Sequence, residues 1–201
     1  MQDNPASEVY QQTGVADRRD SDLADLVRLH TGCLPGSLFS RLGAAVTRSL
    51  YAYVLKSDME LVVVIRDTGG TIVGGSVVSL NPDTLIRRLL LGSGILFNLL
   101  FRFYRFPLNF KRDLPDAYQP GCPELMFLYV DEKHRSLGYG KVLVEGTQQA
   151  LAERGISRLC VYTEDDPQNR AISFYQGLGY TPAGKATKAG TAYLVFEKQL
   201  A

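Results

Sequence analysis

The segment 130–141 (VDEKHRSLGYGK) combines two glycines with two cationic side chains. Gly138 and Gly140 carry no Cβ, so the backbone there can approach a ligand closely. Arg135 and Lys141 add positive charge, and the free N–H groups and dipole of a helix start favour an anion. The pattern predicts an anion site suited to a pyrophosphate, although an ordinary glycine-rich helix start has the same composition. It is neither the GxxxxGK(S/T) loop nor the GxGxxG fingerprint.

A second pattern lies downstream, at 168–180 (QNRAISFYQGLGY). It predicts a helix that carries the small Ala171 and the large apolar Phe174 and Tyr175 on its surface. The helix ends at Gly179, a residue type that suits the C-terminal cap. Taken alone, this is a packing pattern.

In this order the two segments resemble the motifs of the GNAT superfamily of acyl-CoA-dependent N-acyltransferases. The residues that match its first motif, R/Q-x-x-G-x-G/A, are Arg135, Gly138 and Gly140. The residues that match its second motif, N-x-x-A-x-x-x-Y-x-x-x-G-F/Y, are Ala171, Tyr175, Gly179 and Tyr180. The asparagine position of the second motif holds Gln168, and Asn169 follows one residue late. The resemblance is firm over 124–200, looser over 9–80, and does not cover the segment between.

The resemblance implies a mixed α/β GNAT fold. Its sheet of six or seven mostly antiparallel strands is splayed between strands 4 and 5 and flanked by helices, with a basic helical insertion between strands 3 and 4. It also implies acetyl-CoA or another acyl-CoA as co-substrate, held in the splayed gap without a metal. The residues expected to bind it are Leu128, Tyr129, Val130, Arg135, Ser136, Leu137, Gly138, Tyr139, Gly140, Lys141, Gln168, Asn169, Ala171, Phe174 and Tyr175.

Amide formation from a thioester needs a base that removes a proton from the amine, and it benefits from an acid near the leaving thiolate. By resemblance Tyr175 lies near the CoA sulfur, so it is the candidate acid, either protonating the thiolate or hydrogen-bonding it. The alternative is an aromatic ring that packs against the pantetheine arm.

Glu124 is the candidate base, because it begins the strand that is expected to hold the cofactor. The alternative is a surface carboxylate at a strand entrance. Glu164, Asp165 and Asp166 are rivals at the carboxyl end of a central strand, where ligands commonly bind in α/β sheets. Their plainer interpretation is a solvated acidic loop that caps the next helix.

Hydrophobic periodicity predicts the elements that position these residues. The predicted strands are 9–16, 60–65, 71–80, 124–130, 158–163, 180–183 and 191–196. The predicted helices are 22–30, 38–55, 138–154 and 170–178. Residues 1–8 are expected to be a disordered lead-in, and residues 9–201 a single domain with an inserted segment at about 82–121.

The inserted segment is basic and apolar, with no acid from 84 to 112. Its basic residues are Arg87, Arg88, Arg102, Arg105, Lys111 and Arg112. Such helices are suited to contact an anionic membrane surface, to bind a hydrophobic acceptor or a long acyl chain, or to form a dimer interface. The alternative is a lid that packs on its own sheet with its arginines in water. The apolar run 89–101 is too short to span a bilayer.

The amino-acid composition narrows the classes of function and the kinds of site that remain. A net charge of +1 argues against a dedicated nucleic-acid binder. Three scattered cysteines and two histidines predict neither a disulfide framework nor a zinc site. Cys160 is expected to be a core residue, Cys33 incidental, and His30 a plain helix-end residue. With no apolar leader, these observations predict a cytoplasmic protein, and the alternative is peripheral attachment at the inner membrane face through 84–112.

The resulting expectation is an N-acetyltransferase that transfers acetyl from acetyl-CoA to a primary amine of a small-molecule acceptor. The amine attacks directly in a ternary complex, and the enzyme is a monomer or homodimer. The alternatives are a longer acyl-CoA or membrane-linked acceptor, a non-catalytic CoA-binding module, and a peripheral membrane module.

Overall fold

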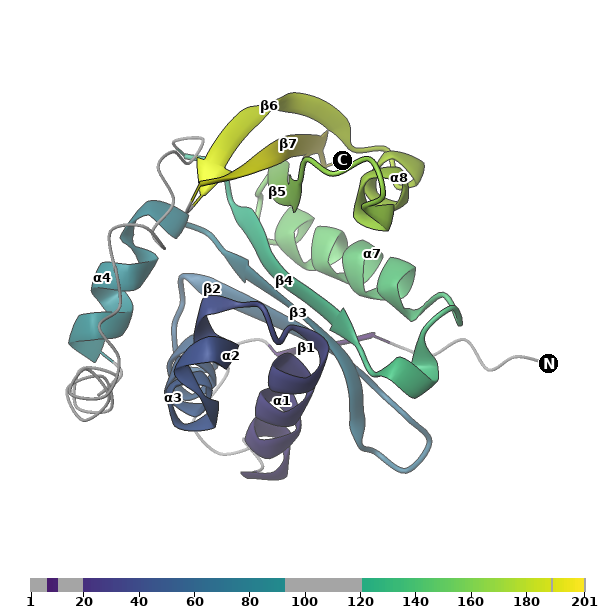
Figure 1. Cartoon of the computed structure of the whole chain (residues 1–201). Helices are drawn as coiled ribbons and strands as arrows, with labels where there is room; N and C mark the ends of the chain where they lie inside the picture. The colour runs from purple at the N-terminus through teal and green to yellow at the C-terminus, as the bar shows by residue number, and fades with distance from the viewer. Residues whose placement is uncertain (1–6, 11–19, 93–120, 189, 201) are drawn as a thin grey trace.

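The computed structural model describes residues 7–10, 20–92, 121–188 and 190–200, and its core is one seven-stranded sheet (Figure 1). The strands are β1 (Ser7–Tyr10), β2 (Glu60–Arg66), β3 (Ile72–Ser79), β4 (Glu124–Val130), β5 (Arg158–Glu164), β6 (Thr181–Lys188) and β7 (Thr191–Gln199). They are ordered β1-β2-β3-β4-β5-β7-β6, and every neighbouring pair is antiparallel except β4 and β5. This is the mixed, mostly antiparallel sheet that the family resemblance implies.

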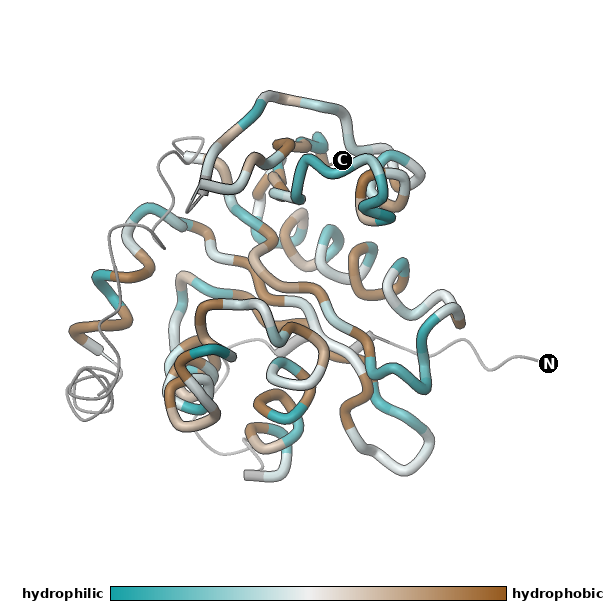
Figure 2. The backbone as a smooth tube through the Cα atoms, in the orientation of Figure 1, coloured by the Kyte–Doolittle hydropathy of each residue, from teal (hydrophilic) through white to brown (hydrophobic). Residues whose placement is uncertain are grey.

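Helices cover both faces of the sheet (Figure 1). They are α1 (Asp20–Cys33), α2 (Leu38–Leu42), α3 (Ala44–Val54), α4 (Pro82–Gly92), the 3-10 turn η1 (Glu132–His134), α7 (Tyr139–Ala152) and α8 (Arg170–Gly177). One hydrophobic core lies under α1–α3 and a second lies under α7 and α8. The alternate residues of β2 enter the two cores in turn, which explains its continuous apolar sequence. Hydrophobic residues follow the central strands, whereas the β2–β3 turn and the segment after β4 are hydrophilic (Figure 2).

The sheet opens between β4 and β5. These parallel strands pair only at Glu124 with Cys160 and Leu125 with Val161, although both strands continue beyond that point. On its other edge β4 carries a bulge, because Val77 pairs with Phe127 and Val78 pairs with Leu125, which leaves Met126 out of register. The splay between the fourth and fifth strands that the family resemblance implies is therefore confirmed.

Several predicted elements differ from the structure in their bounds; the strand predicted over 180–183, for example, is β6 and extends to Lys188. The helix predicted over 38–55 is broken into α2 and α3 at Gly43, whose positive φ of 97° ends the first helix. The first strand begins at Ser7 rather than Val9, so the lead-in predicted over 1–8 extended too far. Residues 11–19, which include most of the predicted strand 9–16, lie outside the described residues.

The cysteine prediction was wrong for two of the three residues. Cys122 and Cys160 form a disulfide across 38 positions of sequence, and Cys33 remains a free thiol. The parallel register brings them together, because Cys160 lies opposite Glu124, two residues after Cys122. Cys160 is indeed buried, but as half of a bond at the closed end of the β4–β5 gap.

The segment predicted as an insertion begins with α4, and residues 93–120 lie outside the described residues. The predicted contacts of Arg102, Arg105, Lys111 and Arg112 therefore fall outside the described part of the chain. Among the helices that the structure describes, none is long and apolar enough to cross a membrane.

Candidate active site

The glycine-rich segment forms a tight connection between β4 and α7. Gly138 has a left-handed φ of 84° and is the N-terminal cap of α7, and Ser136 has a φ of 64°. Among the described residues, no group accepts a hydrogen bond from the N–H groups of residues 137–140. No heavy atom lies within 4 Å of the point where a Cβ would stand on Gly138. The N–H groups at the start of α7 thus have no acceptor within the described chain, as an anion site requires.

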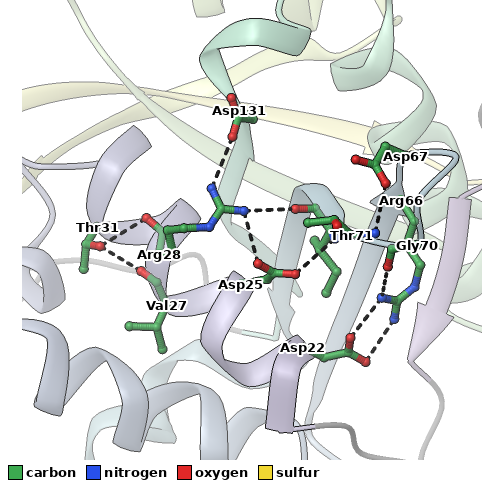
Figure 3. Close-up of polar contacts among 11 residues, drawn as sticks. Asp22, Asp25, Val27, Arg28, Thr31, Arg66, Asp67, Gly70, Thr71 and Asp131 are labelled. Atoms are coloured by element: carbon green, nitrogen blue, oxygen red, sulfur yellow. Dashed lines mark hydrogen bonds and ion pairs between the residues drawn. The ribbon is translucent and has the colours of Figure 1, made fainter.

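A set of polar contacts ties this connection to α1 (Figure 3). Arg28 donates to Asp131 at 3.3 Å and to Asp25 at 3.2 Å, and its other contact is the carbonyl of Ile72 at 3.4 Å. Asp131 also accepts from the N–H of Lys133 at 3.1 Å, which starts the 3-10 turn. The Lys133 N–H, followed by the nearby Arg28, lowers the pKa of Asp131. Arg28 and Asp131 are therefore positioning residues for the segment.

The two cationic residues of the glycine-rich segment, Arg135 and Lys141, have different partners. Nε of Arg135 donates to the carbonyl of Val130 at 3.3 Å, and the thiol of Cys33 approaches the same oxygen at 3.4 Å. Lys141 is exposed on the first turn of α7 and pairs with Glu145 at 3.7 Å. The Val130 carbonyl is thus already engaged by the chain, whereas Lys141 remains at the surface.

The two sequence motifs meet in space. A Cβ on Gly140 would stand 3.5 Å from the ring of Phe174, so the helix start of α7 packs closely against α8. Ala171 and Phe174 also lie at the edge of the core beneath α7 and α8. A Cβ at this position would make ordinary van der Waals contact with the ring, so a residue as small as alanine fits here as well.

Asn169 is the N-terminal cap of α8, and both ends of its amide are occupied. Its oxygen accepts from the N–H of Ala171 at 3.0 Å, and its nitrogen donates to Thr163 Oγ1 at 2.7 Å and to the Glu164 carbonyl at 2.9 Å. The residue thus fastens α8 to the end of β5. Gln168 is exposed, and only its backbone N–H is engaged, by Asp166.

Tyr175 lies in the core beneath α7 and α8 with 6% of its surface exposed. Its ring packs edge-on against Phe174 at 5.1 Å and Tyr180 at 5.5 Å. Burial, and secondarily Tyr180, raises the pKa of its phenol well above the usual value, so the hydroxyl keeps its proton. Within the described chain no residue hydrogen-bonds that hydroxyl.

The β4 residues divide between the two faces of the sheet. Leu128 and Val130 contact the core beneath α7 and α8, whereas Tyr129 is buried in the core beneath α1–α3. The Tyr129 hydroxyl accepts a hydrogen bond from Tyr51 at 2.8 Å. Its side chain is therefore committed to the opposite core, and only its main chain borders the gap.

A buried hydrogen-bonded chain links β4 to α1, α2 and α3, and sequence reasoning missed it. Nδ1 of His30 lies 2.9 Å from the Tyr51 hydroxyl, and its Nε2 lies 2.8 Å from the Ser37 hydroxyl. The His30 ring also meets Phe127 edge-on at 4.7 Å, beside the β4 bulge. Burial lowers the pKa of His30 to about 4, so the imidazole is neutral. The prediction of a plain helix-end histidine was wrong, because the His30 ring faces the core.

Glu124 begins β4 with only 5% of its surface exposed, so it is not a surface carboxylate. It lies where β4 and β5 are still paired, next to the opening of the gap. Of its rivals, Asp165 pairs with Lys185 at 2.7 Å and Asp166 accepts from the Gln168 N–H at 2.9 Å. Glu164 is exposed at the end of β5. Glu124 is the buried carboxylate of the four.

Comparison with protein families matches residues 23–180 to the acetyltransferase (GNAT) family. The chain belongs to the GNAT family. A search of the curated proteins finds no match.

Solved structures agree with the family. A GNAT-family protein from Desulfovibrio desulfuricans has a TM-score of 0.63 at 13% identity, covering 98% of this chain and 100% of its own. An aminoglycoside 6'-N-acetyltransferase complexed with coenzyme A has a TM-score of 0.63 at 14% identity, covering 96% and 97%. The ribosomal-protein-S18-alanine N-acetyltransferase from Escherichia coli has a TM-score of 0.58 at 12% identity, covering 97% and 94%. At such identities these neighbours show the GNAT fold alone.

The described part of this GNAT protein contains no cluster of three or more His, Cys, Asp or Glu side chains suited to a metal ion.

Proposed function

We propose that this GNAT protein is an N-acetyltransferase that transfers acetyl from acetyl-CoA to a primary amine of a small-molecule acceptor. The observation that carries the proposal is the gap between β4 and β5, which opens beside the bulge at Met126 and leads to the open N–H groups at the start of α7. A long, thin molecule with an anionic end fits such a gap, and acyl-CoA has that form.

The residues along the gap fit this co-substrate. The N–H groups of residues 137–140 and the Lys141 side chain would hold the pyrophosphate. The main chain of Leu128 and Tyr129 would hold the pantetheine arm, with Val130 contributing less because its carbonyl is engaged. Ala171 and Phe174 offer apolar contact. Asn169 would contribute indirectly, by capping α8, because both ends of its side-chain amide already hydrogen-bond the chain.

Glu124 and Tyr175 would carry the proton chemistry. When bound, acetyl-CoA supplies an acyl group activated as a thioester. The Glu124 carboxylate accepts the proton that the attacking amine must lose, directly or through water. The Tyr175 hydroxyl donates a hydrogen bond at the departing sulfur. Its raised pKa favours that role over full proton transfer, because a thiol with a pKa of about 8.5 is the stronger acid.

Direct attack requires both substrates to be bound together, and steady-state kinetics tests this. Release of the CoA thiol is followed with a thiol reagent across a panel of amino sugars, amino acids and polyamines. With an active acceptor, double-reciprocal plots at several acetyl-CoA concentrations should intersect. Parallel lines would indicate a covalent acetyl-enzyme and contradict the proposal.

The same assay with a medium-chain acyl-CoA separates acetyl transfer from transfer of a longer chain. Preference for the longer ester would make the inserted segment part of an acyl pocket. Most of the segment 84–112, for which the sequence suggested membrane contact, lies outside the described residues. The proposal therefore keeps a small molecule as the acceptor.

We also propose a cytoplasmic location, where the acyl-CoA co-substrate is available. Disulfides are rare in that compartment, so the Cys122–Cys160 pair provides the test. Alkylation of thiols in cells lysed directly into denaturant, which exposes the buried Cys122 and Cys160, should modify all three cysteines if the protein resides in the reducing cytoplasm. Modification of Cys33 alone would place it in an oxidising compartment.

A further inference from the structure

Arg88, on the first helix of the basic segment, is turned toward the sheet rather than into solvent. Its Nη2 lies 2.7 Å from Oε1 of Glu60, 2.9 Å from the Asn81 carbonyl and 3.4 Å from the Ser79 hydroxyl. The Glu60 side chain is fully buried and that of Arg88 is 21% exposed. The neighbouring Arg87 is exposed. The idea that the arginines of this segment lie in water thus fails for Arg88.

The strand register brings this ion pair beside the candidate base. Glu60 pairs with Ser79 across β2 and β3, and Ser79 pairs with Glu124 across β3 and β4. Directly paired residues of neighbouring antiparallel strands project from the same face of a sheet. Glu60, Ser79 and Glu124 therefore form one row, and Arg88 contacts its first two members.

Two buried carboxylates, on Glu60 and Glu124, stand on either side of Ser79 in this row, and Arg88 pairs with the first of them. Nε and Nη1 of Arg88 are buried and hydrogen-bond no group in the described chain. On the other side of Glu124, the register continues through the disulfide-bonded Cys160 to Glu197, which pairs with Arg158 at 3.8 Å. Arg88 is therefore the cation closest in the row to Glu124 among the described residues.

We propose that Arg88 is a positioning residue that keeps the Glu124 carboxylate ionised, and that α4 is thereby part of the active site. A nearby opposite charge favours the ionised form of a carboxylate, and burial makes that charge more effective. Glu60 opposes the effect, because it takes part of the Arg88 charge for itself. The inference rests on the proposed role of Glu124 as base.

Two nearly isosteric variants test this with shifts of opposite sign. Arg88→Met removes the cation, so Glu124 should titrate about one pH unit higher or more. Glu60→Gln removes the competing carboxylate and leaves the hydrogen-bonding shape, so Glu124 should titrate lower. Arg87→Met removes an exposed cation from the same helix and should leave the titration of Glu124 unchanged. A purely structural role for Arg88 does not produce shifts of opposite sign.

The readout is ¹³C NMR of protein labelled at the glutamate carboxyl carbons. The Glu124 resonance is assigned by its disappearance in Glu124→Gln, and circular dichroism confirms that each variant is folded. An upward shift in Arg88→Met with a downward shift in Glu60→Gln supports the inference. An unshifted Glu124 in folded Arg88→Met overturns it. If Arg88→Met does not fold, Glu60→Gln decides by the same criterion.

The failure of the proposed function has a different signature. Once an acceptor is found, the acid limb of the pH–rate profile of kcat/KM should move with the NMR titration of Glu124 in each variant. If the NMR shifts occur but the acid limb persists in Glu124→Gln, Arg88 does act on Glu124 and another group is the base. That result would overturn the catalytic assignment while leaving the electrostatic link intact.

Discussion

Acidification from pH 7 to pH 4 is expected to destabilise the fold through His30. Both nitrogens of its buried ring are engaged, and burial lowers its pKa to about 4 from an ordinary 6.5. Between these values the unfolded chain binds a proton at His30 and the folded chain does not. The free energy of unfolding therefore falls as the pH falls, by about 1.4 kcal/mol per unit and about 3 kcal/mol over the whole window.

Urea unfolding, followed by circular dichroism at pH 7, 6, 5 and 4, measures this loss. His30→Gln should be less stable than wild type at pH 7, because the hydroxyls of Tyr51 and Ser37 lose their shared partner. That difference should shrink by about 3 kcal/mol at pH 4, since the variant has no imidazole to protonate. The sequence contains only two histidines, so His134→Gln is the matched control for the loss of an imidazole outside this buried hydrogen-bonded chain. A gap between wild type and His30→Gln that stays constant over this range would refute the reasoning.

Three further outcomes are expected. Tyr175→Phe should lower kcat by about ten- to a thousand-fold while acetyl-CoA affinity, measured calorimetrically, stays nearly constant; an unchanged kcat removes the hydroxyl from the mechanism. Cys122→Ser or Cys160→Ser should reduce the free energy of unfolding in urea by up to about 4 kcal/mol, given the 38-residue separation, and equal stability under oxidising conditions would show that the disulfide does not stabilise the fold. Arg28→Met should cost less than about 1 kcal/mol, because the pair with Asp131 is partly exposed, yet weaken acetyl-CoA binding; unchanged binding would contradict its positioning role.

Local patterns predicted the parts of the fold that short stretches of chain determine. The short apolar run at 124–130 predicted β4 with the bounds that the structure has. The glycines at 138 and 140 predicted the start of α7, and the left-handed φ of Gly138 shows why a glycine suits the position before that helix. Family resemblance supplied the splay between β4 and β5, which neither strand's own sequence encodes.

The remaining features depend on which strands and helices are neighbours. Cys122 and Cys160 meet because a parallel register joins segments separated by α7. His30 is buried because α1 turns that side toward Tyr51 and Tyr129, and the spacing of apolar residues in α1 does not reveal this polar partner.

The environment of Glu124 is the clearest example of this limit. Arg88 reads as one basic residue among six in its segment, and only the β2–β3–β4 register identifies it as the one beside the candidate base. The hydrogen bonds that occupy the Asn169 side-chain nitrogen likewise form because the end of β5 lies next to the start of α8.

Calorimetric titration of the purified protein with acetyl-CoA, alongside Gly138→Asn and Gly138→Asp, tests the central claim most directly. Asn tolerates the left-handed conformation at Gly138 better than other side chains, so the pair separates backbone strain from the charge that Asp adds. Wild type should bind with a Kd on the order of micromolar, Gly138→Asn should bind more weakly, and Gly138→Asp should show no binding. No binding by wild type, or equal affinity of the two variants, would contradict an anion site at the start of α7.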